Sequence, residues 1–180
     1  MHDEARTANL LGATALAVSD LFLASVTSAA AVGPSAAAAL VILDRSPGLS
    51  VTELGRRVGL SQPAAARMVD GLEHHGLVRR ERTWGRWVAV RPTEAGTRAA
   101  RGLLTARTDA LREVVDGLEE DERADLDRLL TKVLGALHRT PGDADRLCRL
   151  CDRDACVHLG RVCPVGQAER DSRARQPDDG

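Results

Sequence analysis

The stretch that decides the fold is residues 49–82, which read LSVTELGRRVGLSQPAAARMVDGLEHHGLVRRER. Ser50 is a favourable helix N-cap, and Glu53 stands three residues later, which is the spacing of a capping box. Gly59 follows as a residue that ends helices. These signals predict a short helix over residues 51–58.

A second helix signal follows directly. Ser61 is the next candidate N-cap, and Pro63 stands in the first turn, where its missing N–H costs nothing. Gly76 marks the end of this helix, which we expect to cover residues 61–74. Two helices joined by a short turn that contains glycine form a helix-turn-helix, whose second helix typically lies in the DNA major groove.

Beyond Gly76 the hydrophobic pattern changes from the period of a helix to that of a strand. Residues 77–82 and 87–91 have the pattern of two strands, and residues 83–86 between them contain Gly85. We therefore expect a β-hairpin, or wing, directly after the helix-turn-helix.

Long helices are predicted on both sides of this unit, over residues 3–31, 35–44, 93–115 and 118–137. The first is apolar on more than one face, which in a chain of 180 residues indicates a subunit interface. The last carries an apolar stripe at helical spacing, formed by Leu126, Leu129, Leu130, Val133, Leu134 and Leu137.

The composition also favours helices. Hydrophobic residues make up 43% of the chain, but its aromatic residues are Phe22, Trp84 and Trp87, so the core must be built from Ala, Leu and Val. The predicted fold class is mainly α with a small β-hairpin wing. It is a winged helix-turn-helix protein and an obligate dimer through its N- and C-terminal helices.

The expected organisation has five parts. They are an N-terminal dimerisation helix (1–33), a winged DNA-binding domain (34–92), dimerisation helices (93–140), a cysteine cluster (141–167) and a charged, disordered tail (168–180).

The charge is distributed unevenly along the chain. Residues 49–101 hold ten arginines against five acids, a balance of +5, whereas the whole chain has a net charge of −1. Such segregation is typical of a surface that binds a polyanion, although a merely solvated arginine-rich face has the same composition.

Candidate DNA contacts lie at the start of the second helix of the motif and on the wing. Gln can pair with adenine and Arg with guanine, small side chains allow close approach, and a helix N-terminus offers N–H groups to phosphate. A wing arginine can enter the minor groove or bind phosphates. The candidates are Ser61, Gln62, Pro63, Ala64, Arg67, Arg79, Arg80, Arg82 and Arg86.

Several motifs resemble those of the MarR family of bacterial transcriptional regulators. They are Leu60-Ser61-Gln62-Pro63-Ala64, Arg67-Met68-Val69-Asp70, Gly76-Leu77-Val78-Arg79-Arg80 and, at the end of the wing, Val90-x-Pro92-Thr93-x-x-Gly96. Together with the acidic start of the last long helix, the resemblance covers about residues 5–138.

The resemblance implies a homodimer whose two winged domains bind a pseudo-palindromic operator in double-stranded DNA and usually repress transcription. It also implies release by a small-molecule effector bound between the dimer helices and the winged domain, or by cysteine oxidation. The chain departs from the family at Trp84, which replaces the usual wing-tip Asp, and at Ala66 and Gly71. We therefore expect a different operator sequence.

All four cysteines fall in one short run, with the spacing C-x2-C-x4-C-x6-C: Cys148, Cys151, Cys156 and Cys163. In a cytoplasmic protein such clustering indicates metal or redox chemistry before structural disulfides. If residues 145–151 form a helix, the first two cysteines share one face of it.

Three interpretations of the cysteines stay open. Four thiolates suit an iron–sulfur cluster, which the Cys163-Pro164 pair favours, and they equally suit a closed Zn²⁺ site. The third interpretation is a set of thiols that form disulfides on oxidation. His158 lies within the run, either as a zinc ligand in place of one cysteine or as an ordinary loop residue.

Other classes of protein fit the sequence less well. An enzyme is not expected, because no βαβ pattern surrounds the cysteines and no nucleophile–base–acid set stands out. A winged domain that serves as a protein-interaction module is the remaining alternative. Residues 10–32 are apolar, but an acidic leader and Asp20 argue against a signal peptide or membrane span, so we expect a cytoplasmic protein. An effector pocket is expected near the first and fifth helices.

Overall fold

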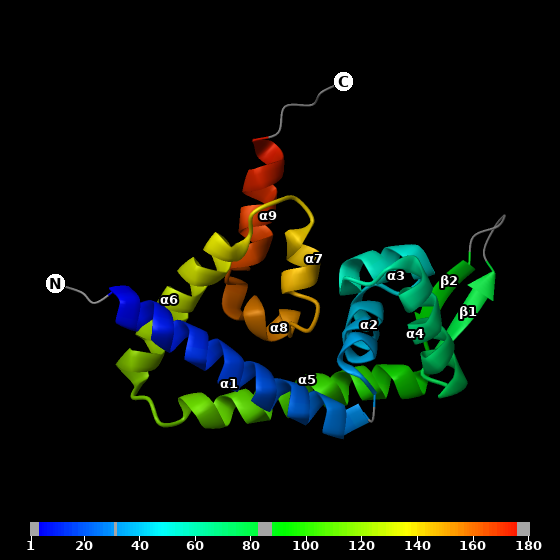
Figure 1. The fold of residues 1–180 in the computed structure, drawn as a ribbon, viewed down its shortest axis with the longest axis horizontal. Coiled ribbons are helices and arrows are strands. Elements are labelled where there is room, and N and C mark those ends of the chain that lie inside the picture. The colour runs from blue at the N-terminus through cyan, green and yellow to red at the C-terminus, as the bar shows by residue number, and fades with distance from the viewer. Residues whose placement is uncertain (1–3, 31, 83–87, 176–180) are drawn as a thin grey trace.

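The computed structural model describes residues 4–30, 32–82 and 88–175 (Figure 1). Along the chain its elements are α1 Glu4–Ala30, α2 Pro34–Arg45, α3 Val51–Val58, α4 Gln62–His74, β1 Val78–Arg82, β2 Val88–Pro92, α5 Glu94–Val115, α6 Glu120–Leu137, α7 Asp143–Leu147, α8 Arg153–Cys156, the 3₁₀ turn η1 His158–Gly160, and α9 Pro164–Ala174. The predicted fold class, mainly helical with a small hairpin, is confirmed. The predicted hairpin turn at residues 83–86 lies outside the described residues.

The apolar core lies in the winged domain, where α2 is enclosed by α3, α4, the hairpin and the first half of α5. In the described ranges, every buried hydrophobic side chain is Ala, Leu or Val, as the composition predicted. The largest fully buried side chains are Leu40, Leu43, Leu54, Leu72, Leu103, Val41, Val69, Val78 and Val90. This core fixes the orientation of α4 relative to the hairpin.

The turn between α3 and α4 depends on two glycines. Gly59 adopts φ 84°, in the left-handed region that favours glycine. Gly55 lets the two helices approach closely, since a Cβ at this position would lie 2.6 Å from the Cβ of Ala65. The predicted N-cap of α3 is confirmed, because the Ser50 hydroxyl accepts a hydrogen bond from the Glu53 N–H at 3.1 Å.

The hairpin is joined to the helices on both sides. β1 and β2 pair antiparallel, with Arg80 opposite Val90, and Val90 also exchanges backbone hydrogen bonds with the Gly48–Leu49 segment before α3. Thr93 caps α5 by accepting a hydrogen bond from the Gly96 N–H at 3.1 Å. The described strands are therefore bonded to the segment before α3 and lead directly into α5.

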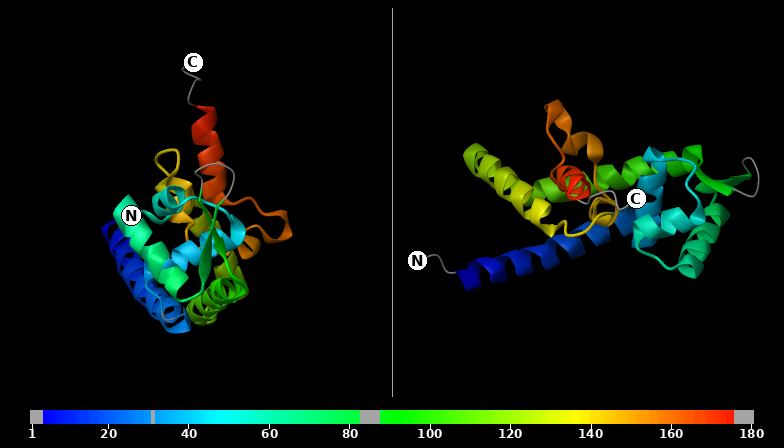
Figure 2. Two further views of the ribbon diagram at one scale, coloured as in Figure 1. Left: turned by 90° about the vertical axis from the view of Figure 1, so that its right-hand side faces the viewer. Right: turned by 90° about the horizontal axis from the view of Figure 1, so that it is seen from above.

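The long helices extend away from this core. α1 lies against α5, and α6 turns back from the far end of α5 (Figures 1 and 2). Large apolar side chains on α1 and α6 are 40–71% exposed: Leu10, Leu11, Leu16, Leu129, Leu130, Leu134 and Leu137. These are the surfaces for which the sequence predicted a dimer interface, and the interface itself stays a prediction.

The helical stretch Glu4–Ser25 has the length and the apolar composition that would let a helix cross a membrane. It is the one such stretch in the described residues. Buried helices of soluble proteins and N-terminal signal sequences have the same properties.

The chain after α6 forms a C-terminal segment, residues 138–175, which lies between α6 and α3 (Figure 1). The condition under which Cys148 and Cys151 would share a helix face is not met, because α7 ends at Leu147 and a turn follows in which the Cys151 N–H bonds the Cys148 carbonyl at 3.0 Å. One prediction was wrong here. The tail expected to be disordered from residue 168 instead continues as α9 to Ala174, because buried Glu169 anchors it through hydrogen bonds.

Two glycines of α5 provide a matched test of the close contact between the start of α5 and Leu77. A Cβ at Gly96 would overlap the carbonyl oxygen of Leu77, whereas a Cβ at Gly102 would meet nothing within 4 Å. We expect Gly96→Ala to lower the free energy of unfolding by about 3 kcal/mol. Gly102→Ala should raise it by up to about 1 kcal/mol, because alanine is the better helix former. Urea unfolding followed by circular dichroism measures both, and equal effects would contradict the junction described above.

Candidate nucleic-acid interface and cysteine segment

The first turns of α4 present an open face. Their exposed residues are Ser61, Gln62, Pro63 and Arg67, with Ala64 half-buried among them. The opposite face enters the core through Ala65, Val69 and Leu72, as predicted. Ser61 occupies the N-cap position, but contrary to the prediction its side chain makes no capping hydrogen bond. The first N–H groups of α4 therefore lack a side-chain acceptor and can meet a phosphate.

Two of the predicted wing contacts are held by acidic neighbours. Arg80 bonds Asp70 on α4 at 2.6 Å and also pairs with Glu73, which fastens β1 to α4. Arg79 bonds Glu81 at 2.6 Å and holds the pKa of that carboxyl below its ordinary value. Both guanidinium groups are thus partly neutralised within the chain.

The other candidate arginines differ in this respect. Within the described ranges, Arg67 on α4 and Arg82 at the end of β1 are exposed and have no acidic partner. Arg86 lies outside the described residues. Of the described candidates, Arg67 and Arg82 therefore keep the most positive charge available for a phosphate or a base.

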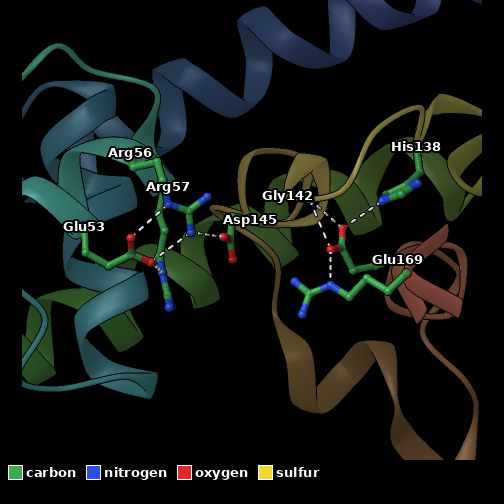
Figure 3. Close-up of polar contacts among 8 residues, drawn as sticks. Glu53, Arg56, Arg57, His138, Gly142, Asp145 and Glu169 are labelled. Atoms are coloured by element: carbon green, nitrogen blue, oxygen red, sulfur yellow. Dashed lines mark hydrogen bonds and ion pairs between the residues drawn. The ribbon is translucent and has the colours of Figure 1, made fainter. Parts of the chain in front are cut away.

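An ion-pair relay links α3 to the C-terminal segment (Figure 3). Arg56 donates to both carboxylate oxygens of Glu53 at 2.8 Å and to Asp145 of α7 at 2.6 Å, and Arg57 donates to Glu53 at 2.7 Å. The hydrogen bonds from Arg56 and Arg57 lower the pKa of Glu53 to about 2. The first helix of the helix-turn-helix is thereby connected directly to the segment that carries the cysteines.

A second polar anchor holds α9 (Figure 3). The carboxylate of Glu169, whose side chain is 11% exposed, bonds His138 Nε2 at 2.8 Å, the Gly142 N–H at 3.0 Å and Arg173 Nε at 2.7 Å. The hydrogen bond with His138 is the main cause that lowers the pKa of Glu169 to about 2. This carboxylate joins the end of α6, the start of α7 and α9.

Sequence reasoning missed both anchors. Arg56 and Glu53 showed only a helical spacing, and their long-range partner Asp145 had no pattern of its own. Glu169 and His138 are 31 positions apart. The only available signal was that Glu169 and Arg173 stand at helical spacing within the stretch that was expected to be disordered.

The four cysteines come together beside α2 and α5. All are half-buried and none forms a disulfide. Consecutive thiols interact as neighbours, Cys148 with Cys151, Cys151 with Cys156, and Cys156 with Cys163. The thiols thus lie as neighbouring pairs along the chain, and the four-cysteine site stays a prediction.

The thiols differ in their acidity. The hydrogen bond from Cys148 lowers the pKa of Cys151 to about 6, and the charges of Arg107 and Arg45 act in the same direction. Burial, and then the neighbouring Cys151, raise the pKa of Cys156 to about 12. Hydrogen bonding to Cys151 and burial raise the pKa of Cys148. One thiolate within this row thus suppresses ionisation of its neighbours.

The predicted metal site stays a prediction. As the described side chains stand, no group of three or more His, Cys, Asp or Glu residues has the arrangement of a metal site. His158, the alternative ligand, is exposed in η1.

Two clefts flank the cysteines. One, of about 290 Å³, lies between α1, α5 and the end of α7, and its lining includes Phe22, Arg107 and Cys151. It lies where the sequence predicted an effector pocket, whose occupant stays a prediction. The other, of about 380 Å³, separates the C-terminal segment from α2 and α3, and its lining includes Arg45, Arg57, Arg149, Arg153, Cys148 and Cys163.

Comparisons with known proteins agree on the fold. Residues 34–83 match the model of the MarR family. A MarR family protein from Bacillus stearothermophilus is similar in structure at 23% identity, with a TM-score of 0.66, over 77% of this chain and 100% of that one. MepR, a transcription regulator of the Staphylococcus aureus multidrug efflux pump MepA, is similar at 17% identity, with a TM-score of 0.65, over 72% and 97%. No curated protein matches the chain.

The chain therefore has the winged-helix fold of MarR transcription regulators. YusO from Bacillus subtilis gives the same result, at 21% identity and a TM-score of 0.65 over 74% of this chain and 96% of that one. Since these neighbours are matched almost completely by about three quarters of this chain, about a quarter of it is additional to their fold. Residues 138–180, which follow α6, have about that length.

The Glu169 anchor predicts a pH-dependent stability. Because the pKa of Glu169 is lowered on folding, its ionised form stabilises the folded chain above about pH 4.5, and this contribution is lost as the pH falls toward 2. We expect Glu169→Gln to cost roughly 2 kcal/mol at pH 7 and much less at pH 3. Thermal unfolding at both pH values measures the difference, with exposed Glu120→Gln as the control. A loss that is the same at both pH values would refute the anchor.

Proposed function

We propose that this chain is a homodimeric, sequence-specific DNA-binding regulator of transcription, acting as a repressor in the cytoplasm. The observation that carries the proposal is the exposed first half of α4, where Gln62 and Arg67 project from a helix whose other face is fixed in the core. A reading helix needs this combination, because side chains can discriminate bases only when their backbone is held firmly.

Each candidate contact has a separate chemical role. Gln62 and Arg67 suit adenine and guanine edges in the major groove, while Ala64 permits close approach. Arg82 supplies charge to the phosphates flanking the groove, which adds affinity without sequence information. Arg79 and Arg80, which already pair with acids, orient the wing and add a weaker positive field. We assign Arg86 to the minor groove from the family resemblance alone.

The proposed dimer follows from the exposed apolar surfaces of α1 and α6. Seven large aliphatic side chains of these helices are at least 40% exposed in a single chain, and so much exposed apolar surface is typical of helices that pack against a second copy. A second copy that covers it places two α4 helices on one side of the dimer. Their target is then a pseudo-palindrome with half-sites about one helical turn, roughly 34–36 Å, apart.

We propose that the operator affinity is controlled from the region between the winged domain and α5. The cleft lined by Phe22, Arg107 and Cys151 is the candidate site for a small-molecule effector, and the four cysteines are the candidate sensor. A purely structural zinc site, with the signal carried by the small molecule, and a thiol switch are the alternatives. Both controls act on the same dimer helices.

The assignment of α4 is tested by base-edge variants. An operator is first selected from a pool of random duplexes, and affinity is then measured by fluorescence anisotropy. We expect Arg67→Ala to weaken binding about 10- to 100-fold and to relax the preference at one base pair in each half-site. Arg128→Ala on α6, which removes an exposed arginine far from the winged domain, should change affinity by less than a factor of about 2. Binding that is unaffected by Arg67→Ala, or that does not weaken with salt, would refute the proposal.

The dimer is tested on α6. We expect Leu134→Arg to convert the dimer to a monomer in light scattering, because it places a charge in the apolar stripe. Lys132→Glu, on the opposite face of α6, should leave the dimer intact. Since the monomer loses the second reading helix, its affinity for the full operator should fall by about a hundredfold or more. A Leu134→Arg chain that remains dimeric would contradict this interface.

A further inference from the structure

The C-terminal segment, residues 138–175, has almost no apolar core. Of its described residues, Val165 and Glu169 are buried, the His138 side chain is 3% exposed, and Leu150 packs against the core of the winged domain. Its helices α7, α8 and α9 contain five, four and eleven residues, whereas isolated helices below about 12–15 residues are marginal in water. Units of this size are ordinarily held together by disulfides or a metal. A cross-link between these short helices would therefore add stability that the segment's own core does not supply.

The polar anchors secure only the edges of the segment. Glu169 fastens α9 to the end of α6, and Asp145 fastens α7 to Arg56 of α3. Between them, residues 148–163 are ordered by tight turns and by the exposed pair Arg161–Asp127 at 3.1 Å. Leu150 packs against the core of the winged domain, but exposed pairs contribute little, and none of residues 151–163 is buried, so the stretch that carries Cys151, Cys156 and Cys163 is held weakly.

The cysteines lie where a cross-link would act. Cys148 and Cys151 bound the turn after α7, Cys156 is the last residue of α8, and Cys163 is the N-cap of α9. The Gly166 N–H points at the Cys163 sulfur at 3.4 Å. Hydrogen bonds from backbone N–H groups to sulfur stabilise thiolates and tune the metal centres that thiolates bind. One centre that joins the four sulfurs would connect all three short helices.

Arginines near the cysteines supply the positive charge that such a centre needs. Four thiolates and a divalent ion carry a net charge of −2, which is costly to enclose without cations nearby. Arg45 of α2 and Arg107 of α5 act electrostatically on Cys151, and Arg149 and Arg153 line the same cleft as Cys148 and Cys163. Soft thiolate donors select zinc or iron–sulfur centres over calcium or magnesium.

We propose that Cys148, Cys151, Cys156 and Cys163 together ligate one thiophilic metal centre, a zinc ion or an iron–sulfur cluster, which cross-links the C-terminal segment. The thiols stand as neighbouring pairs and not yet as a closed set. Ligation draws them together by χ1 rotations and releases their protons. Leu159 and Gly160, both with left-handed backbone at φ 57° and 75°, form the bend that brings Cys163 back toward Cys156.

The metal centre also has a route to the DNA-reading helices, a step that rests on the proposed function. Ordering residues 148–163 fixes α7, and α7 holds α3 through Asp145 and Arg56. α3 packs on α4 at Gly55 and Ala65, so its position sets the orientation of the reading helix. Loss of the metal would loosen α7 and alter the operator affinity.

The metal site is tested on the full-length chain, purified without oxygen and also after reconstitution with zinc alone or with iron and sulfide. We expect one centre per chain, lost in Cys148→Ser and Cys156→Ser and retained in His158→Ala. Colourless protein with bound zinc identifies the ion, and brown protein with iron and sulfide identifies the cluster.

Because a serine variant can lose metal by misfolding, Co²⁺ is titrated into the wild-type chain, where the intensity of thiolate-to-cobalt charge transfer counts the sulfur ligands. A chain that binds no metal, or that merely forms disulfides on oxidation, would overturn the proposal.

The cross-link predicts protection from trypsin. With metal bound, cleavage at Arg149, Arg153 and Arg161 should slow at least about tenfold, while cleavage at exposed Arg112 on α5 stays unchanged. Equal cleavage with and without metal would show that the centre does not order the segment.

The route to DNA is tested separately. Asp145→Asn should retain the metal but lose the metal dependence of operator affinity, and exposed Asp154→Asn should retain both. If the chain binds no metal, the Arg67→Ala measurement still tests DNA binding. If the chain binds no DNA, the metal analysis still tests the metal centre, so each proposal can be refuted without the other. An Asp145→Asn chain that still responds to metal would refute the relay through Arg56.

Discussion

The structure depends on the small apolar core around α2. It lies inside the winged domain and extends to the first half of α5, to Phe22 of α1 and to Leu150 of the C-terminal segment. The rest of the chain has no such core, so α1, α6 and the C-terminal segment must obtain their stability from other contacts. Exposed leucines would do this for α1 and α6 in the proposed dimer, and the buried carboxylate of Glu169 and the Arg56–Asp145 ion pair do it at the edges of the C-terminal segment.

Charged side chains have different roles in the winged domain and around the cysteines. Acids pair with Arg79 and Arg80 of β1, whereas Arg67 and Arg82, among the described candidate contacts, are exposed and have no acidic partner. Around the cysteines, arginines from α2 and α5 lie close enough to act on the thiols. A net charge of −1 therefore conceals two separate groups of arginines.

The sequence was informative wherever stability is local. Ser50, Gly59 and the alternating strands after Gly76 act on their immediate neighbours, so the winged domain and the outward residues of α4 could be predicted. The C-terminal segment could not, because its determinants are pairs far apart in the chain, such as His138 with Glu169 and Arg56 with Asp145. The charged stretch after residue 167 lacks apolar residues and so predicts disorder, but the hydrogen bonds of buried Glu169 hold α9 in place. The spacing of the cysteines suggested that they act together, but the course of the backbone between them, through turns and short helices, could not be predicted.

The apolar surfaces of α1 and α6 have a genetic consequence. Assembly in the proposed dimer depends on these helices and not on α4, so a chain with a damaged reading helix still pairs with an intact chain. Such mixed pairs carry one functional reading helix and bind a two-part target poorly. In a cell that holds both alleles, an altered α4 would therefore be dominant, whereas an altered α6 would be recessive because its product never enters the pair.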